Sequence, residues 1–359
     1  MIEDFLQSQR NAVNDEIEKF FTQLNQQEGS VLFNDYINEF KTFVINENAK
    51  RLHPALLIAA FNGIINPIYL QDQRTNIRKV SLSIEFLHTG HLIQDDLIDD
   101  DKIRREAPTF HYQLKEEMEH LLEAENEDQI SNQALFYGKN ISLLGGPYSY
   151  ILGLNIIKDS NFPENLKLMA IKEYTDATNY LLKGQIIEEY LNSHSIVMSI
   201  EQYLNVAELV RATVFEKATK IGAILAKGNL HYQIKPLSTA MLKIGQAYAI
   251  TDDIIDVRRD IKAKNKNKFP YLLALNNIDE NQSSALNKIY NKEQRDETDI
   301  ETVFDIFTDT NALRIAKQFA TNLVMQGKQA LEEIYPDLNK DQKGFFNEFA
   351  DYTVNRLNE

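Results

Sequence analysis

Cysteine is missing from the 359 residues, which excludes disulfides, thiolate metal sites and cysteine nucleophiles. Glycine and proline are scarce, at 13 and 8 residues, so few positions interrupt a helix. No apolar run approaches the roughly 20 residues that span a bilayer. The first twenty residues lack the basic start and apolar core of a secretory signal. These absences favour a soluble, cytoplasmic protein with no transmembrane segment.

Positive charge is also in short supply. Lysine and arginine together number 38 against 53 aspartates and glutamates, which gives a formal net charge of −15. Nucleic-acid backbones attract basic surfaces, so we expect no nucleic-acid partner.

What the chain does have is apolar periodicity of the helical type. Residues 33–43 and 315–334 each place their apolar side chains on one stripe at a spacing of three to four. Strand-like alternation between turn signals is nearly absent. The pattern predicts one all-α domain over residues 1–359. It carries an acidic insertion at about 114–133, which we interpret as a surface helix or a long loop.

The segment LIQDDLIDDDKIRRE, residues 92–106, crowds five aspartates into seven positions. In a helix, Asp95 and Asp99 share a face, and Asp96 lies on the adjacent face. Convergent carboxylates bind Mg²⁺, which often bridges them to substrate phosphates. An exposed acidic helix is the alternative. The interleaved Ile93, Leu97 and Ile98 favour a helix packed into the core.

The same pattern recurs in AYAITDDIIDVRRD, where Asp252, Asp253 and Asp256 repeat the DDxxD spacing. Two such helices facing each other would form a cup of six carboxylates, which holds several Mg²⁺ ions around a diphosphate. Arg104 and Arg105 follow the first triplet. They suit bidentate phosphate contacts or neutralise the neighbouring aspartates. The sequence therefore predicts a metal–diphosphate site.

At these residues the chain resembles the trans-isoprenyl diphosphate synthases, the polyprenyl synthetase family. The segment 84–111, IEFLHTGHLIQDDLIDDDKIRREAPTFH, is similar to the first motif block of that family nearly throughout. The segments GQIIEE at 184–189, KIGAILA at 220–226 and GQAYAITDDIID at 245–256 resemble further family elements. The likeness extends over most of the chain from about residue 30.

The resemblance implies an isoprenoid synthase fold, which is a helical bundle around a central active-site cavity, and a homodimer. It also implies a prenyltransferase that condenses an allylic diphosphate with isopentenyl diphosphate, using several Mg²⁺ ions. The implied metal ligands are Asp95, Asp96, Asp99, Asp252, Asp253 and Asp256. Arg104 would support the allylic diphosphate and Gln185 would lie beside it. The other implied substrate contacts are Lys50, Arg51, His88, Arg105, Lys266 and Arg356.

Several positions depart from the family pattern. In NAKRLHP, at residues 48–54, His53 replaces an arginine that contacts isopentenyl diphosphate. A protonated histidine still binds phosphate, though more weakly near neutral pH. Arg211 stands one position from the usual lysine and is the candidate substitute for that contact. The loop after the second triplet looks short and lacks the Gly-Lys that the family usually has there, and Arg258 or Arg259 is the candidate that compensates for it.

Product length depends, in this family, on side chains just before the first triplet. Gly90 is small and His91 is larger. Because a filled core admits almost no extra methylenes, a small residue at position 90 favours a product of geranylgeranyl length or longer over farnesyl.

Three alternatives remain open. A terpene synthase would ionise the diphosphate without adding an isopentenyl unit, but its second metal motif usually carries Asn, Ser or Thr, and Glu, unlike the intact DDIID here. A weakly active or non-catalytic subunit of a heteromeric prenyl synthase would be expected to lose the carboxylates of the triplets first, but both triplets are intact here. Prenyl transfer to another acceptor fits the altered isopentenyl diphosphate site.

Overall fold

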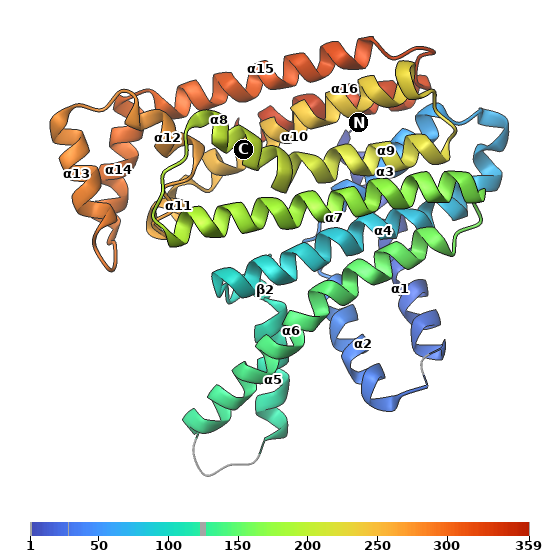
Figure 1. The fold of residues 1–359 in the computed structure, drawn as a ribbon, viewed down its shortest axis with the longest axis horizontal. Coiled ribbons are helices and arrows are strands. Elements are labelled where there is room, and N and C mark those ends of the chain that lie inside the picture. Colours follow the sequence, from blue (N-terminus) through green and yellow to red (C-terminus); the bar gives the residue numbers. More distant parts are fainter. Residues whose placement is uncertain (1, 28, 123–126, 359) are drawn as a thin grey trace. The chain divides into compact units, whose positions relative to one another are not determined.

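The computed structural model describes residues 2–27, 29–122 and 127–358. These residues are almost entirely helical, apart from a two-stranded antiparallel hairpin, so the all-α prediction is confirmed (Figure 1). The predicted acidic insertion lies partly on helices, but residues 123–126 are outside the described residues. In the part of the chain that is described, no helix is both long and apolar enough to cross a membrane.

The chain divides into two compact units, Met1–Thr178 with Ile221–Lys227, and Asn179–Lys220 with Gly228–Glu359. The prediction of a single domain therefore stays a prediction. The first unit contains α1 (Ile2–Gln27), α2 (Val31–Val44), α3 (Leu52–Ile64), α4 (Pro67–Asp99), β1 (Ile103–Arg104), β2 (Ala107–Pro108), α5 (Phe110–Leu121), α6 (Glu127–Lys158) and the first half of α7 (Glu164–Ser193).

The core of the first unit is rich in aromatic rings. Phe21 of α1, Phe40 of α2, Phe86 of α4 and Phe110 of α5 are all fully buried. The ring centroids of Phe21, Phe40 and Phe86 lie 5.8–6.1 Å apart. Such ring pairs add to the stabilisation from burial. This cluster holds α4, which carries the first acidic triplet at its end.

The second unit contains the remaining elements. They are α8 (Ile200–Ala207), the π-helix η1 (Glu208–Ala212), most of α9 (Thr213–Leu225), the π-helix η2 (Leu230–Ile234), α10 (Lys235–Ile255), α11 (Val257–Lys262), α12 (Phe269–Leu275), α13 (Glu280–Tyr290), α14 (Glu297–Asp309), α15 (Ala312–Glu332), α16 (Lys340–Asn355) and the 3₁₀ turn η3 (Arg356–Asn358).

Helix α10 is the centre of the second unit, because α15, α16 and η1 all pack against it. Its close neighbours require small side chains. A Cβ on Gly245 would lie 2.5 Å from the Cα of Ala212 in η1, and one on Gly327 would lie 2.8 Å from Ile244. The second acidic triplet is at the C-terminal end of this helix.

Candidate active site

The first triplet lies where α4 ends. Asp100 adopts a left-handed conformation, φ 54°, and caps the helix. The chain then turns back through the hairpin β1–β2, whose two turn residues, Arg105 and Glu106, also have positive φ. Positive φ at both central positions is what a two-residue hairpin of type I′ requires. This turn brings Arg104 back to the carboxylates that precede it.

Arg104 binds two aspartates of the triplet. Its Nε donates to Asp96 Oδ1 at 2.6 Å, and its Nη2 lies 3.3 Å from Asp95 Oδ2. The neutralising role considered for Arg104 is therefore present in the structure. Burial raises the pKa of Asp96 to about 6, although the hydrogen bond from Arg104 opposes the rise.

The exposure of the interleaved residues only partly matches the prediction. Ile93 is buried, but Ile98 is 46% exposed and Asp99 also faces outward. The expectation that all the aliphatic residues pack into the core is therefore wrong for Ile98, because the last turn of α4 extends beyond the core. Asp100, which is also exposed, forms an ion pair with Lys139 at 2.7 Å.

Arg51 is held almost entirely by the protein itself. Its guanidinium forms an ion pair with Glu85 of α4 and donates to the Val44 carbonyl at 2.6 Å and to Asn14 Oδ1 at 2.9 Å. Its side chain is fully buried, whereas Lys50 beside it is exposed. Arg51 thus ties α1, α2 and α4 together, and its predicted contact with isopentenyl diphosphate stays a prediction.

The rings of His53 and His88 lie 4.5 Å apart, between centroids. Burial lowers the pKa of His53 to about 4 and that of His88 well below its usual value. Burial also lowers the pKa of the neighbouring Arg105, against the attraction of Glu85. At neutral pH both histidines are neutral, so His53 offers a phosphate a hydrogen bond but no charge.

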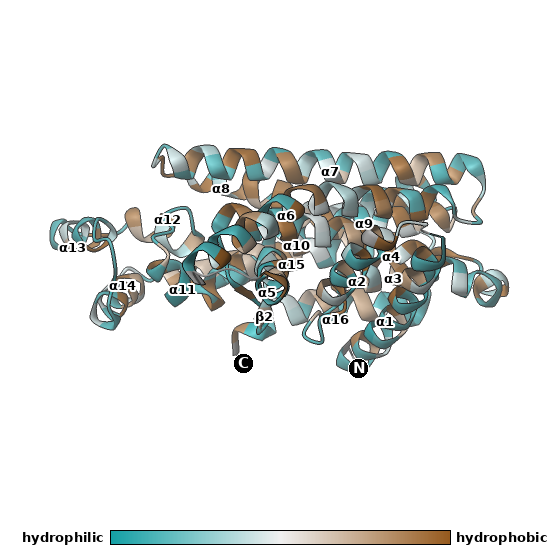
Figure 2. Ribbon diagram, turned by 90° about the horizontal axis from the view of Figure 1, so that it is seen from below, coloured by the Kyte–Doolittle hydropathy of each residue, from teal (hydrophilic) through white to brown (hydrophobic). Residues whose placement is uncertain are grey.

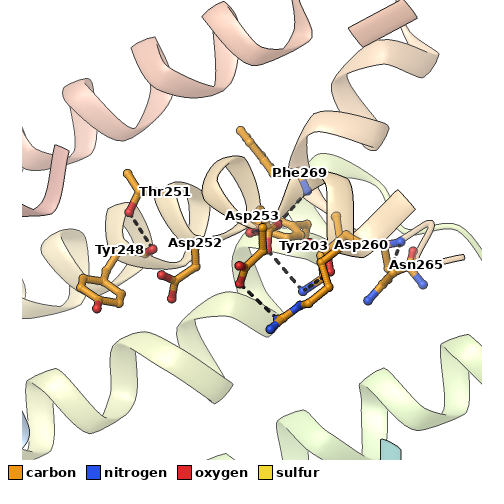
Figure 3. A network of polar contacts seen from close by, with 12 residues as sticks. Tyr203, Tyr248, Thr251, Asp252, Asp253, Asp260, Asn265 and Phe269 are labelled. Atoms are coloured by element: carbon orange, nitrogen blue, oxygen red, sulfur yellow. Dashed lines mark hydrogen bonds and ion pairs between the residues drawn. The ribbon is translucent and has the colours of Figure 1, made fainter. Parts of the chain in front are cut away.

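In the second triplet, Asp253 is fully engaged by the protein (Figure 3). Its Oδ2 accepts from the Tyr203 hydroxyl at 2.7 Å and from the Phe269 backbone N–H at 2.8 Å. Its Oδ1 lies 3.4 Å from the Lys268 ammonium. Asp253 therefore anchors the start of α12 to α10. Asp260, also near Lys268, has its pKa raised to about 6 by burial.

Asp252 and Asp256 are engaged by arginines. Arg356 forms an ion pair with Asp252 and stacks its guanidinium over the Tyr248 ring at 4.0 Å. Burial raises the pKa of Asp252, against the effect of Arg356. Arg259 lies 3.1 Å from Asp256 Oδ2. Arg356 thus contacts a predicted metal ligand.

The loop between α11 and α12 holds a residue that sequence reasoning missed. Lys266, the predicted phosphate ligand, points over the Tyr290 ring at 5.8 Å, whereas Lys268 reaches Asp253. The segment KNKFP contains both lysines, so spacing alone did not distinguish them. Arg258, the other candidate in this region, binds Glu301 at 2.6 Å and is occupied by that contact.

Arg211 and Gln185 also lie in the second unit. Arg211 is on η1, and such π-helical turns are frequent at functional sites. It is close enough to affect the pKa of Tyr203 and of Lys268. The buried Oε1 of Gln185 has no hydrogen-bond partner within the described part of the chain, which leaves an acceptor for a ligand.

Gly90 faces helix α6 at close range. A Cβ there would lie 2.7 Å from the Gly146 carbonyl oxygen and 2.8 Å from the Tyr150 ring. The Tyr150 hydroxyl donates to Gln94 at 2.8 Å. His91, which follows Gly90 on α4, is buried. Close helix packing by itself requires glycine at position 90. The product-length argument from Gly90 and His91 therefore stays a prediction.

The described residues contain no group of three or more Asp, Glu or His side chains arranged to hold a metal ion. Mg²⁺ does not require such a cage, because it usually binds one or two carboxylates together with substrate phosphates and water. The buried Oδ2 of Asp96 has no hydrogen-bond partner among these residues. A buried carboxylate oxygen normally has one. The residues therefore fit a cation that arrives with a diphosphate.

A sequence model of the polyprenyl synthetase family matches residues 34–307. Among curated proteins, the geranylfarnesyl diphosphate synthase of Natronomonas pharaonis is 22% identical over 335 residues, which cover 88% of each chain. The octaprenyl diphosphate synthase of Haemophilus influenzae is 23% identical, with 82% of each chain covered.

A solved structure has a similar fold. It is the geranylgeranyl pyrophosphate synthase of Corynebacterium glutamicum in complex with isoprenyl diphosphate and magnesium. It superposes with a TM-score of 0.85 at 20% identity and covers 99% of both chains. At this identity the superposition supports the all-α fold.

Proposed function

Because the chain belongs to the polyprenyl synthetase family of trans-isoprenyl diphosphate synthases, we propose that it condenses an allylic diphosphate with isopentenyl diphosphate to give a longer trans-prenyl diphosphate. The observation that supports this most is the pair of DDxxD triplets. Each lies at the C-terminal end of a helix, and each has an arginine paired with its first aspartate.

In the proposed reaction, the carbon–oxygen bond of the allylic diphosphate breaks and leaves an allylic carbocation. The double bond of isopentenyl diphosphate forms the new carbon–carbon bond, and the released diphosphate takes up the proton that is lost. Mg²⁺ bound with the diphosphate would stabilise the negative charge that develops on the leaving group.

The protein residues would divide the remaining work. Arg104 would orient the first triplet and contact the allylic diphosphate, because it already joins Asp95 and Asp96. Asp252 and Asp256 would be the accessible carboxylates of the second triplet, since Asp253 is committed to Tyr203, Phe269 and Lys268. The neutral His53 would donate a hydrogen bond to isopentenyl diphosphate in place of the usual arginine.

The test is to incubate the purified protein with Mg²⁺, isopentenyl diphosphate and each allylic primer, and to identify the products by mass. We expect a longer prenyl diphosphate from at least one primer. Asp95→Ala and Asp252→Ala should each lower kcat by about a hundredfold or more, because each removes charge stabilisation of the leaving group.

Asp101→Ala is the matched control, since Asp101 is exposed and lies just beyond the first triplet. Its activity should stay near that of the wild type. Absence of a longer product with every primer, from protein that melts cooperatively, would refute the proposal. Product mass would also test the expected length of geranylgeranyl or more.

We further propose that the protein is a cytoplasmic homodimer. Apolar side chains are exposed along one face of α6, at Phe136, Leu143 and Ile151. Others are exposed on α7, where apolar and polar residues alternate in short bands (Figure 2). An apolar stripe of this kind is typical of a protein–protein interface.

Prenyl transfer to an acceptor other than isopentenyl diphosphate is the second candidate. The observation that favours it is the replacement at position 53, because a histidine with a pKa of about 4 supplies no charge to a second diphosphate. A product formed from an allylic diphosphate and a nucleophile in the absence of isopentenyl diphosphate would support this alternative.

A further inference from the structure

A cavity of about 760 Å³ lies among α2, α5 and α6 of the first unit. Its size is in the range of small-molecule binding sites. Most of its wall is apolar or aromatic, and the residues that form it include Phe33, Tyr36, Leu114, Met118, Ile141 and Tyr148. None of the predicted catalytic or substrate-binding residues lines it.

Three acidic residues also line this cavity. Asp35 and Glu39 are one turn apart on α2, and Glu117 comes from α5. Burial raises the pKa of Glu117, and the nearby charges of Glu39 and Asp35 raise it further. Like charges that approach in an apolar setting repel each other, so the cavity has an unfavourable negative potential.

The protein does not neutralise these acids with its own cations. Across the described residues, no lysine or arginine forms an ion pair with any of the three. Glu39 Oε2 accepts from the neutral amide of Gln113 at 2.7 Å, and Glu117 and Glu39 also form a side-chain hydrogen bond with each other. The excess negative charge is therefore available to a ligand.

The aromatic residues of the wall suit the same kind of ligand. Tyr137 and Tyr148 line the cavity, and the faces of tyrosine rings attract cations. Tyr36 also lines it, but its ring stacks on Phe33 and Phe40, so it offers its hydroxyl rather than a ring face. The Tyr36 hydroxyl is buried and has no hydrogen-bond partner within the described segments, so it offers a further polar contact. A cationic group beside a hydrophobic body would satisfy the carboxylates and the apolar wall together.

We propose that this cavity is a second binding site, separate from the proposed active site, for an organic monocation: a protonated amine carried on an aryl or alkyl body. The carboxylates of Glu39 and Glu117 bind the ammonium group, and the apolar side chains of α2, α5 and α6 surround the body. Charge complementarity and the apolar wall select this ligand class over anions and over neutral lipids.

The test uses three probes with one carbon skeleton: 4-phenylbutylamine, 4-phenylbutanol and 4-phenylbutanoate. Isothermal titration calorimetry on the full chain at neutral pH should give one amine bound per chain. We expect the amine to bind about tenfold more tightly than the alcohol, with no measurable binding of the carboxylate. Equal affinity of the amine and the alcohol would overturn the proposal.

Glu39→Gln and Glu117→Gln should each weaken amine binding about fivefold or more, because each removes one negative charge from the cavity. Glu116→Gln is the matched control, since Glu116 is exposed on α5 and does not line the cavity. Equal weakening by Glu116→Gln would show a non-specific charge effect and refute the site.

The same titration in saturating Mg²⁺ and inorganic pyrophosphate separates this cavity from the proposed active site. Amine affinity should be unchanged. Displacement of the amine by these ligands would assign the binding to the active site and overturn the inference. No turnover is measured, so the result does not depend on the proposed function.

Discussion

Asp96 and Asp253 occupy the same position in the two triplets, but their environments differ. Asp96 has a buried oxygen with no hydrogen bond from the described residues, and its pKa is raised to about 6. Asp253 receives hydrogen bonds from Tyr203 and Phe269 and has Lys268 nearby. Asp96 therefore keeps an oxygen that none of the described residues satisfies, whereas Asp253 is held by contacts within the protein.

Replacement of Lys268 tests this structural role. Lys268→Met should lower the free energy of unfolding by about 2 kcal/mol, because it leaves the buried carboxylates of Asp253 and Asp260 without their cation. Lys266→Met is the control and should cost about 0.5 kcal/mol, since Lys266 makes only a cation–π contact with Tyr290. Urea unfolding measures both. Equal effects would contradict the assignment.

His53 gives the protein a pH-dependent stability. Its folded-state pKa is about 4, below the ordinary value of 6.5, so the unfolded chain binds its proton more readily between these values. The contribution of the neutral His53 to the free energy of unfolding is fully present above pH 6.5. It is lost as the pH falls toward 4, by at most about 1.4 kcal/mol per pH unit.

His53→Gln should reduce the pH dependence of the free energy of unfolding between pH 6.5 and 4. Urea unfolding of the variant and the wild type at pH 7, 6 and 5 would show the difference. The gap between the two proteins should change by about 1 kcal/mol for each pH unit below 6. A constant gap over this range would contradict the low pKa of His53.

At the scale of helices, the close approach of α4 to α6 depends on small residues. Gly90→Ala would place a Cβ 2.7 Å from the Gly146 carbonyl oxygen and should destabilise the protein by about 1–3 kcal/mol. Gly344→Ala on α16 is the control, because a Cβ there meets nothing within 4 Å. It should stabilise the protein by up to about 1 kcal/mol. Thermal melts of both variants measure the contrast.

The helical content and the placement of the two triplets on separate helices could be predicted from the sequence, because apolar periodicity and the DDxxD spacing are local patterns. Their position at the C-terminal ends of those helices comes from the structure. The partners of the triplets could not. The residues that engage Asp252 and Asp253, namely Arg356 and Tyr203, are distant in the sequence, and no local pattern links them. The choice of Lys268 over Lys266 likewise depends on how the loop packs.

At the scale of the whole molecule, the exposed apolar stripe on α6 predicts self-association. In size-exclusion chromatography with light scattering, the wild type should have twice the chain mass of 41.4 kDa. Leu143→Glu and Ile151→Glu should shift it toward the monomer, because each introduces charge into the proposed apolar interface, where both side chains are exposed in the single chain. Glu164→Gln, at the exposed start of α7, is the control and should leave the mass unchanged.

The two triplets acquire their arginines at very different times during synthesis. Arg104 follows Asp96 by only eight residues, so this contact can form once the hairpin β1–β2 has left the ribosome. Arg356 follows Asp252 by 104 residues. Since domains fold from the N-terminus during translation, the ion pair between Asp252 and Arg356 can form only after the rest of the second unit has been synthesised. A pause in elongation after α10 would therefore expose an unneutralised carboxylate to the chaperones that meet nascent chains.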